Sequence, residues 1–138
     1  DVAGSRSALD REERIVKDGI LRMGSLVESQ IRDAIRAIVE RDQALADRVI
    51  ASDVAVNDAQ REINDTVITA IATQQPVARD LRFLMALTHV ASELERIGDH
   101  ATNIAENIYY LVHGEMLREQ RPKKDKTAIT PFNAVNND

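Results

Sequence analysis

The stretch that decides the fold reads SELERIGDHATNIAE and covers residues 92–106. An α-helix turns by about 100° per residue, so residues four apart lie nearly above one another. In a helix, this stretch carries one narrow oxygen-rich stripe, which consists of Glu95, Asp99, Thr102 and Glu106, with Asn103 at its edge. The apolar residues fall on roughly the opposite side and are Leu94, Ile97, Ala101, Ile104 and the following Ile108. The pattern predicts the middle of a long amphipathic helix.

Outward from this stretch, apolar residues recur every three or four positions over most of the chain. We expect three long helices, over residues 9–40, 42–73 and 76–112. Long helices with short connections predict an all-α fold, an antiparallel up-down-up three-helix bundle. The low aromatic content of 3%, with no Trp, requires an aliphatic core, which favours packing of helix on helix.

The ends of the expected helices carry recognisable signals. Asp42 suits the N-cap of the second helix, Pro76 suits the first position of the third, and Gly114 suits a C-terminal stop. Gly19 and Gly24 lie inside the first helix, where each costs about 1 kcal/mol relative to Ala. These two glycines mark close packing or simply weaken the first turns.

The chain divides into three parts by its pattern. We expect residues 1–8 to be flexible, residues 9–114 to form the bundle, and residues 115–138 to be a polar tail. The tail is basic near Arg121 and loses all helical periodicity.

Composition excludes several classes of function. The formal net charge of −5 argues against nucleic acid as a partner, since binding phosphates requires a basic face. There is no Cys, which excludes disulfides and thiolate chemistry and is compatible with the cytoplasmic location that we expect. No apolar run approaches the roughly 20 residues of a membrane span, so direct membrane insertion is not expected.

The oxygen-rich stripe is the strongest candidate for a site. Two carboxylates one turn apart, Glu95 and Asp99, repel each other by a few tenths of a kcal/mol, and a bound cation would offset this cost. Oxygen ligands suit Mg, Mn, Fe or Zn. Because the acids oppose Ile97 and Ile104, we expect such a site on the outer surface of the bundle. On spacing alone, a solvated acidic face is the simpler interpretation. Asp53 and Asn57, four apart near the edge of the second helix's apolar face, form a weaker candidate of the same kind.

Sequence signals for catalysis are weak. The chain has no Glu-x-x-His pair, no Gly-rich phosphate loop and no Gly-x-Ser-x-Gly elbow. We therefore expect a protein that is not an enzyme. Two alternatives are a metal-dependent enzyme that uses Glu95 and Asp99, and a plain helical dimerisation module.

Two blocks of sequence resemble the PhoU family of phosphate-signalling and phosphate-transport accessory proteins. They read QQPVARDLR, residues 74–82, and LERIGDHATNIAE, residues 94–106. The segment MGSLV, residues 23–27, and the break at Arg41-Asp42 are also similar to the family. The resemblance covers about residues 9–114.

This resemblance implies Glu/Asp-x-x-x-Asp pairs that hold iron or zinc clusters on the surface, and oxygen ligands also suit Mg and Mn. Glu95 and Asp99 match the pattern, whereas Asp53 and Asn57 match in part, because Asn replaces the final acid. Asn103 is an additional ligand by position. The resemblance also implies a negative regulator of the phosphate-starvation response, which docks on the ATP-binding subunit of a phosphate transporter and on a sensor histidine kinase.

Family members usually contain the three-helix bundle twice, whereas this chain contains it once. We expect a single-repeat form whose homodimer rebuilds the six-helix arrangement; a fragment of a longer chain is the alternative. Several apolar residues beside the main stripes either widen the core of a monomer or bury against a second copy, namely Ile15, Ile35, Val39, Ile50, Ile68 and Met85.

Overall fold

The structure is a computed structural model that describes residues 2–114. The expected tail, residues 115–138, lies outside the described residues. The elements are α1 (Val2–Glu40), α2 (Gln43–Ala51), α3 (Asp53–Gln74) and α4 (Ala78–His113), and the described part of the chain contains no strand.

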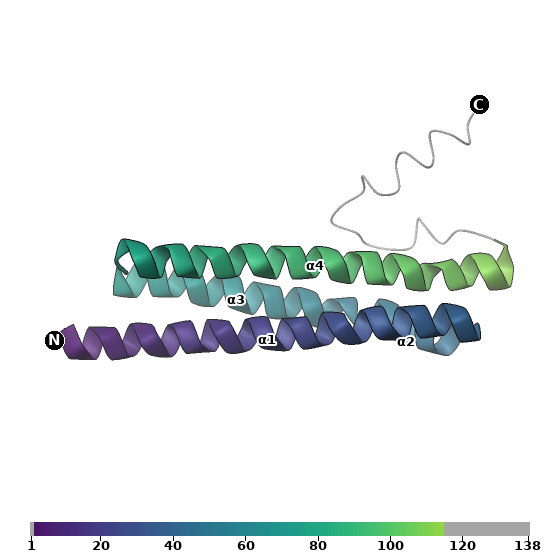
Figure 1. The fold of residues 1–138 in the computed structure, drawn as a ribbon, viewed down its shortest axis with the longest axis horizontal. Coiled ribbons are helices and arrows are strands. Elements are labelled where there is room, and N and C mark those ends of the chain that lie inside the picture. Colours follow the sequence, from purple (N-terminus) through teal and green to yellow (C-terminus); the bar gives the residue numbers. More distant parts are fainter. Residues whose placement is uncertain (1, 115–138) are drawn as a thin grey trace, which may run out of the picture.

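The four helices form three rods that lie lengthwise against one another. In Figure 1, α1 runs in one direction, α2 and α3 return, and α4 runs parallel to α1. The expected antiparallel up-down-up three-helix bundle is therefore confirmed. Within the described residues, no helix is both long enough and apolar enough to traverse a lipid bilayer.

The first rod differs from its expected boundary. α1 begins at Val2, so residues 2–8, which we expected to be flexible, belong to the first helix. Arg6 in this segment forms ion pairs with Asp10 at 3.2 Å and with Asp80 of α4 at 2.8 Å. The apolar periodicity did not predict this segment of the helix, because its contacts with the rest of the bundle include ion pairs.

The second rod is divided at Ser52, where a single continuous helix was expected. The Ser52 backbone keeps nearly helical angles, φ −69° and ψ −12°, so α2 and α3 continue in almost the same direction. The Ser52 hydroxyl donates to the Val49 carbonyl at 2.6 Å. This bond competes with the helical ladder and accounts for a break at Ser52.

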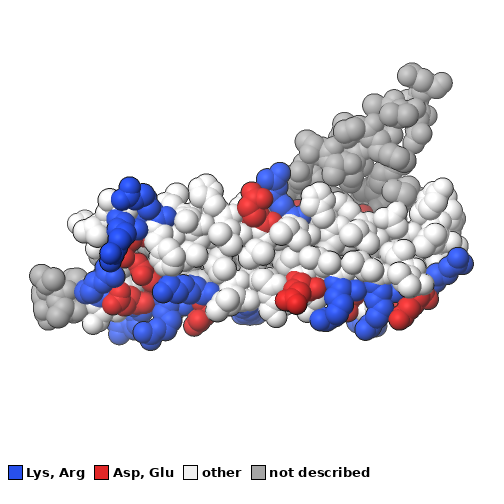
Figure 2. All heavy atoms as spheres, in the orientation of Figure 1, with Lys and Arg blue, Asp and Glu red and all other residues white. Residues whose placement is uncertain are grey.

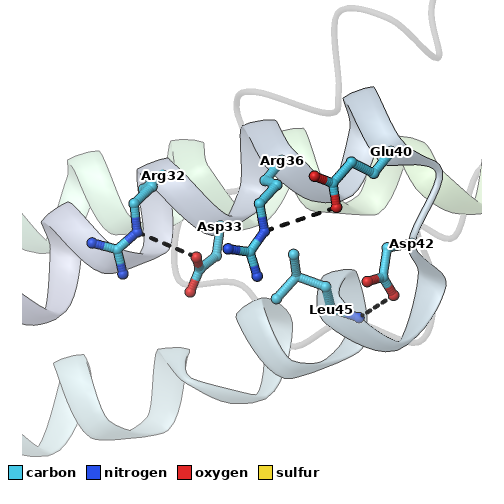
Figure 3. A network of polar contacts seen from close by, with 6 residues as sticks. All are labelled: Arg32, Asp33, Arg36, Glu40, Asp42 and Leu45. Atoms are coloured by element: carbon cyan, nitrogen blue, oxygen red, sulfur yellow. Dashed lines mark hydrogen bonds and ion pairs between the residues drawn. The ribbon is translucent and has the colours of Figure 1, made fainter.

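The connections between the rods follow the predicted signals. Asp42 caps α2, and its carboxylate accepts from the Leu45 N–H at 3.0 Å (Figure 3). Arg41 and Gln75, which precede Asp42 and Pro76, have positive φ of 54° and 46°. Pro76 itself precedes the N-cap Val77 rather than opening α4, and Gly114 ends α4 with φ 69° as expected.

Two separate groups of buried apolar side chains form the core. The first cluster joins α1, α3 and α4 and contains Leu9, Val16, Met23, Val27, Val56, Ala59, Ile63, Val67, Ala70, Leu84 and Ala91. The second cluster joins α1, α2 and α4 and contains Ala34, Ala37, Leu45, Ala46, Val49, Ala105 and Ile108. Between the two clusters, the helices carry several polar residues that are buried or half-buried.

Candidate functional site

The orientation of α4 corrects the expected position of the site. Glu95 is 7% exposed and Thr102 is fully buried, whereas Ile97 is 41% and Ile104 is 38% exposed. The oxygen-rich stripe therefore turns partly into the bundle, and two of the apolar residues opposite it, Ile97 and Ile104, face outward. The prediction that the site would lie on the outer surface is wrong.

Small residues explain this orientation. Ala91, Gly98 and Ala105 follow one another at seven-residue spacing and are buried. They lie on α4 between the oxygen-rich stripe and the row that contains Ile97, so neither stripe marks the centre of the buried face. Small side chains let helix axes approach closely. The seven-residue spacing of these three small residues could have indicated the buried face of α4, but the larger apolar residues beside them made it hard to recognise.

The polar residues between the two clusters form what we call the polar layer, in which Gln30, Glu95 and Thr102 are buried and Ser52 and Asp53 are half-buried. The Gln30 Nε2 donates to the Ser52 Oγ at 2.9 Å, which links α1 to the break between α2 and α3. Gly98 makes room for this contact, because a Cβ at position 98 would lie 2.7 Å from the Gln30 Oε1. Gln30 and Ser52 were not predicted as site residues. The sequence signal for Gln30 was its position in the apolar stripe of the first helix, at helical spacing between Val27 and Ala34.

Two amide oxygens near the polar layer are buried acceptors. The Gln30 Oε1 and the Asn57 Oδ1 are inaccessible to solvent and accept no hydrogen bond within the described residues. The Asn57 Nδ2 donates to the Asp53 Oδ2 at 3.4 Å. A buried carbonyl oxygen without a donor costs free energy, which a cation or a water molecule would offset.

The two predicted ligand pairs lie at the same level of the bundle. A Cβ on Gly98, the neighbour of Asp99, would contact Val56, the neighbour of Asn57, at 3.7 Å. Asp53 and Asn57 of α3 therefore lie at the level of the α4 segment that carries Glu95, Asp99 and Asn103. Nevertheless, no three Asp, Glu or His side chains in residues 2–114 converge in a group that could hold a metal ion.

The donor chemistry suits a hard or borderline cation. Glu95, Asp99 and Asp53 offer carboxylate oxygens, and Asn57 offers a buried amide oxygen. Holding a metal would require side chains of both pairs to move toward one another.

Three ionisable residues lie together at the end of the first cluster that is farther from the polar layer. Glu13 and Asp80 are buried and adjacent, and the exposed Arg6 reaches Asp80. Burial, and then the contact with Asp80, raises the pKa of Glu13, whereas the hydrogen bond from Arg6 lowers the pKa of Asp80. These three residues tie α1 to α4, so we assign them a structural role.

Comparison with known proteins gives a consistent result. Residues 20–108 match the model of the PhoU domain. The chain is 41% identical over 102 residues to a phosphate-specific transport system accessory protein PhoU homolog of Rhizobium meliloti, covering 74% of this chain and 43% of the relative. It is 41% identical over 104 residues to the homolog of Clostridium acetobutylicum, covering 72% and 48%.

A third relative, the phosphate-specific transport system accessory protein PhoU of Serratia marcescens, is 46% identical over 89 residues, covering 64% of this chain and 37% of the relative. The chain therefore spans less than half the length of the curated relatives that it matches. The names of these relatives describe accessory proteins of a phosphate-specific transport system. Since the domain model matches well over half of the chain, the chain belongs to the PhoU family.

Proposed function

We propose that this chain is a regulatory module of phosphate transport, which damps the phosphate-starvation response by docking on other proteins and catalyses no reaction. The observation that carries the proposal is the match of residues 20–108, which is most of the bundle, to the PhoU domain. The names of the relatives place those proteins with a phosphate transport system. The partners that we propose are the ATP-binding subunit of a phosphate transporter and a sensor histidine kinase.

Complementation tests this function directly. In a bacterial strain that lacks its own PhoU protein, the phosphate-starvation reporter is expected to stay active in high phosphate. Expression of the full chain should lower this reporter activity. In parallel, the purified chain should bind the purified ATP-binding subunit or the kinase domain. An unchanged reporter, together with no binding to either protein, would overturn the proposal.

We further propose that the polar layer and its neighbours bind a metal ion through Glu95, Asp99, Asn103, Asp53 and Asn57. The support is the donor chemistry and the buried Asn57 oxygen; iron or zinc follows from the family resemblance, with Mg and Mn as alternatives. When bound, the metal would join α3 to α4 and stabilise the docking surface. No step of catalysis is assigned to it.

Elemental analysis of the purified chain, followed by titration with Zn²⁺, Fe²⁺ and Mn²⁺, measures this binding. Glu95→Ala should weaken the affinity by at least about tenfold, a loss that even supporting residues commonly cause. Glu93→Ala is the matched control, because Glu93 lies two residues away on α4 and its side chain is 70% exposed. Absence of bound metal, or equal loss in both variants, would contradict the proposal.

We also propose that the chain forms a homodimer, since two copies supply the six helices that a two-repeat relative would contain. Solution mass measurement over a range of protein concentrations tests it. A mass of one chain at every concentration would rule out the dimer.

A further inference from the structure

The first half of α1 carries basic residues on the side that borders α4. Arg6 and Lys17 are separated by close to three helical turns and therefore lie on the same side of α1, and Arg14 lies nearly one turn before Lys17. The Arg6 guanidinium lies 2.8 Å from the Asp80 carboxylate, and the Lys17 Nζ lies 5.4 Å from the centroid of the Phe83 ring. Since Asp80 and Phe83 both belong to α4, these cations lie along the line where α1 and α4 meet.

The beginning of α4 adds two arginines to this line. Arg79 lies in the first turn of α4, and Arg82 and Phe83 follow about one turn later. Both arginines are exposed, and Phe83 is 38% exposed. We call this surface the basic patch, and its five cations are Arg6, Arg14, Lys17, Arg79 and Arg82.

Most cations of the basic patch have no carboxylate partner. Arg6 contacts Asp10 at 3.2 Å as well as Asp80. Within residues 2–114, the other four cations of the patch form no ion pair. The remaining basic residues of α3 and α4, Arg61 and Arg96, are instead paired with acids on their own helices, at 3.1 Å and 3.5 Å. The patch therefore carries positive charge that the bundle itself does not neutralise.

The acids near the basic patch are fewer than the cations, and two of them are buried. Residues 2–22 and 78–83 contain seven Lys and Arg and five Asp and Glu, and of these acids Glu13 and Asp80 are only 7% and 5% exposed. The rest of the described chain contains six Lys and Arg and thirteen Asp and Glu. Figure 2 shows that Lys and Arg gather at the end of the molecule where α1 and α4 begin, on the left. One end of an acidic bundle therefore has a basic surface, which attracts negatively charged partners.

A short acidic segment of a protein suits the basic patch better than an extended polyanion does. Arg6 and Lys17 are about 17 Å apart along α1, whereas the whole of α1 is about 58 Å long. A bilayer or a nucleic acid that lies along the bundle would therefore also meet the acidic remainder of the surface, which would repel it. The exposed Phe83 ring offers an apolar contact beside the cations, and aromatic residues with a polar rim are typical of protein interfaces.

We propose that the basic patch is the docking site for an acidic segment of a partner protein, whose carboxylates pair with the cations while an apolar side chain lies on Phe83. Arginine is suited to this role, because its guanidinium binds a carboxylate through two parallel hydrogen bonds. The basic patch gives the proposed docking function, on which this inference rests, a surface and a partner chemistry.

Charge reversal tests the basic patch in the full chain. The variant that combines Arg79→Glu with Arg82→Glu should bind the purified ATP-binding subunit or kinase domain at least about tenfold more weakly, because like charges would meet at the interface. The matched control combines Arg32→Glu with Arg61→Glu and should bind as the wild type does. It changes the net charge by the same amount, at side chains that are 64% and 68% exposed. Binding of the wild type should also weaken between about 0.1 M and about 1 M salt, as the Debye length falls from about 10 Å to about 3 Å.

A second variant, which combines Arg14→Glu with Lys17→Glu on α1, should show the same loss, and circular dichroism should show that every variant is folded. Binding that survives in both patch variants as in the control overturns the basic patch and leaves the docking function standing. A wild-type chain that binds neither protein and leaves the phosphate-starvation reporter unchanged overturns both. Binding of the wild type to phosphatidylserine vesicles, lost in the patch variants, would make an anionic membrane the occupant and overturn the acidic protein segment.

Discussion

The two apolar clusters on either side of the polar layer are built differently. The first cluster contains large side chains from three long helices, such as Met23, Ile63 and Leu84. The second contains seven buried residues, of which four are Ala, and its large members are Leu45, Val49 and Ile108. The short α2 supplies two of these three. The comparison indicates that fewer large apolar side chains are buried at the α2 end. Each large residue and each polar contact there should therefore contribute a larger share of the stability of that end.

The largest effect is expected from Ile108→Ala in the second cluster. Ile108 is fully buried, and truncation should lower the free energy of unfolding by about 3 kcal/mol through lost burial and a cavity. Denaturant unfolding measures this loss. Amide hydrogen exchange should accelerate first around α2, while the end built on α3 stays protected.

The control for this variant is Ile68→Ala, which removes the same atoms from a side chain that is 63% exposed. Its effect should stay within about 0.5 kcal/mol. Equal acceleration of hydrogen exchange at both ends of the bundle would mean that the clusters unfold as one unit.

The second prediction concerns close packing in the first cluster. A Cβ at Gly19 would lie 2.8 Å from a buried Ile63 carbon, so Gly19→Ala should cost about 1–2 kcal/mol despite its gain in helix propensity. Gly24→Ala meets nothing within 4 Å and should raise stability by up to about 1 kcal/mol. Thermal unfolding of the two variants should move in opposite directions. A stabilised Gly19→Ala would show that α1 and α3 do not pack as closely as the structure has them.

The same pair of glycines shows how far the sequence predicts the fold. The spacing of apolar residues was sufficient for three rods and their directions, and the capping residues Asp42 and Gly114 marked two of the ends correctly. It offered no means to tell Gly19, which lies against Ile63, from Gly24, which faces open space, because that depends on the neighbouring helix.

The candidate site was predictable in part. The sequence indicated Glu95, Asp99 and the α3 pair, and the structure places both pairs at one level. The sequence did not indicate which edge of α4 turns inward. This helix is apolar over a wide arc, and the centre of its buried face is set by Ala91, Gly98 and Ala105. Gln30 was missed for a related reason, since a polar side chain in an apolar stripe has no partner until the helices are packed.

The third prediction tests the dependence of the α2 end on its cap. Asp42→Ala removes the acceptor for the Leu45 N–H and should cost about 1 kcal/mol (Figure 3). Asp42→Asn should restore most of that stability. Glu40→Ala is the nearby control, because its ion pair with Arg36 is 4.0 Å long and both side chains are more than half exposed. If Asp42→Ala and Glu40→Ala cost the same, the cap contributes nothing specific.

The smallest expected effect belongs to the other polar contact of the α2 end, the hydrogen bond from the Tyr109 hydroxyl to Asp47. This bond raises the pKa of Tyr109 from 10.0 to about 12. Folding therefore favours the neutral phenol, and the contribution is full below pH 10 and is lost as the pH rises from 10 toward 12. Tyr109→Phe should cost about 0.5 kcal/mol at neutral pH, since the contact lies near the surface. Denaturant unfolding should show that the difference in free energy of unfolding between wild type and variant disappears between pH 10 and pH 12. A difference that stays constant across this range would show that the bond is not formed and that the second cluster alone holds α2 to α4.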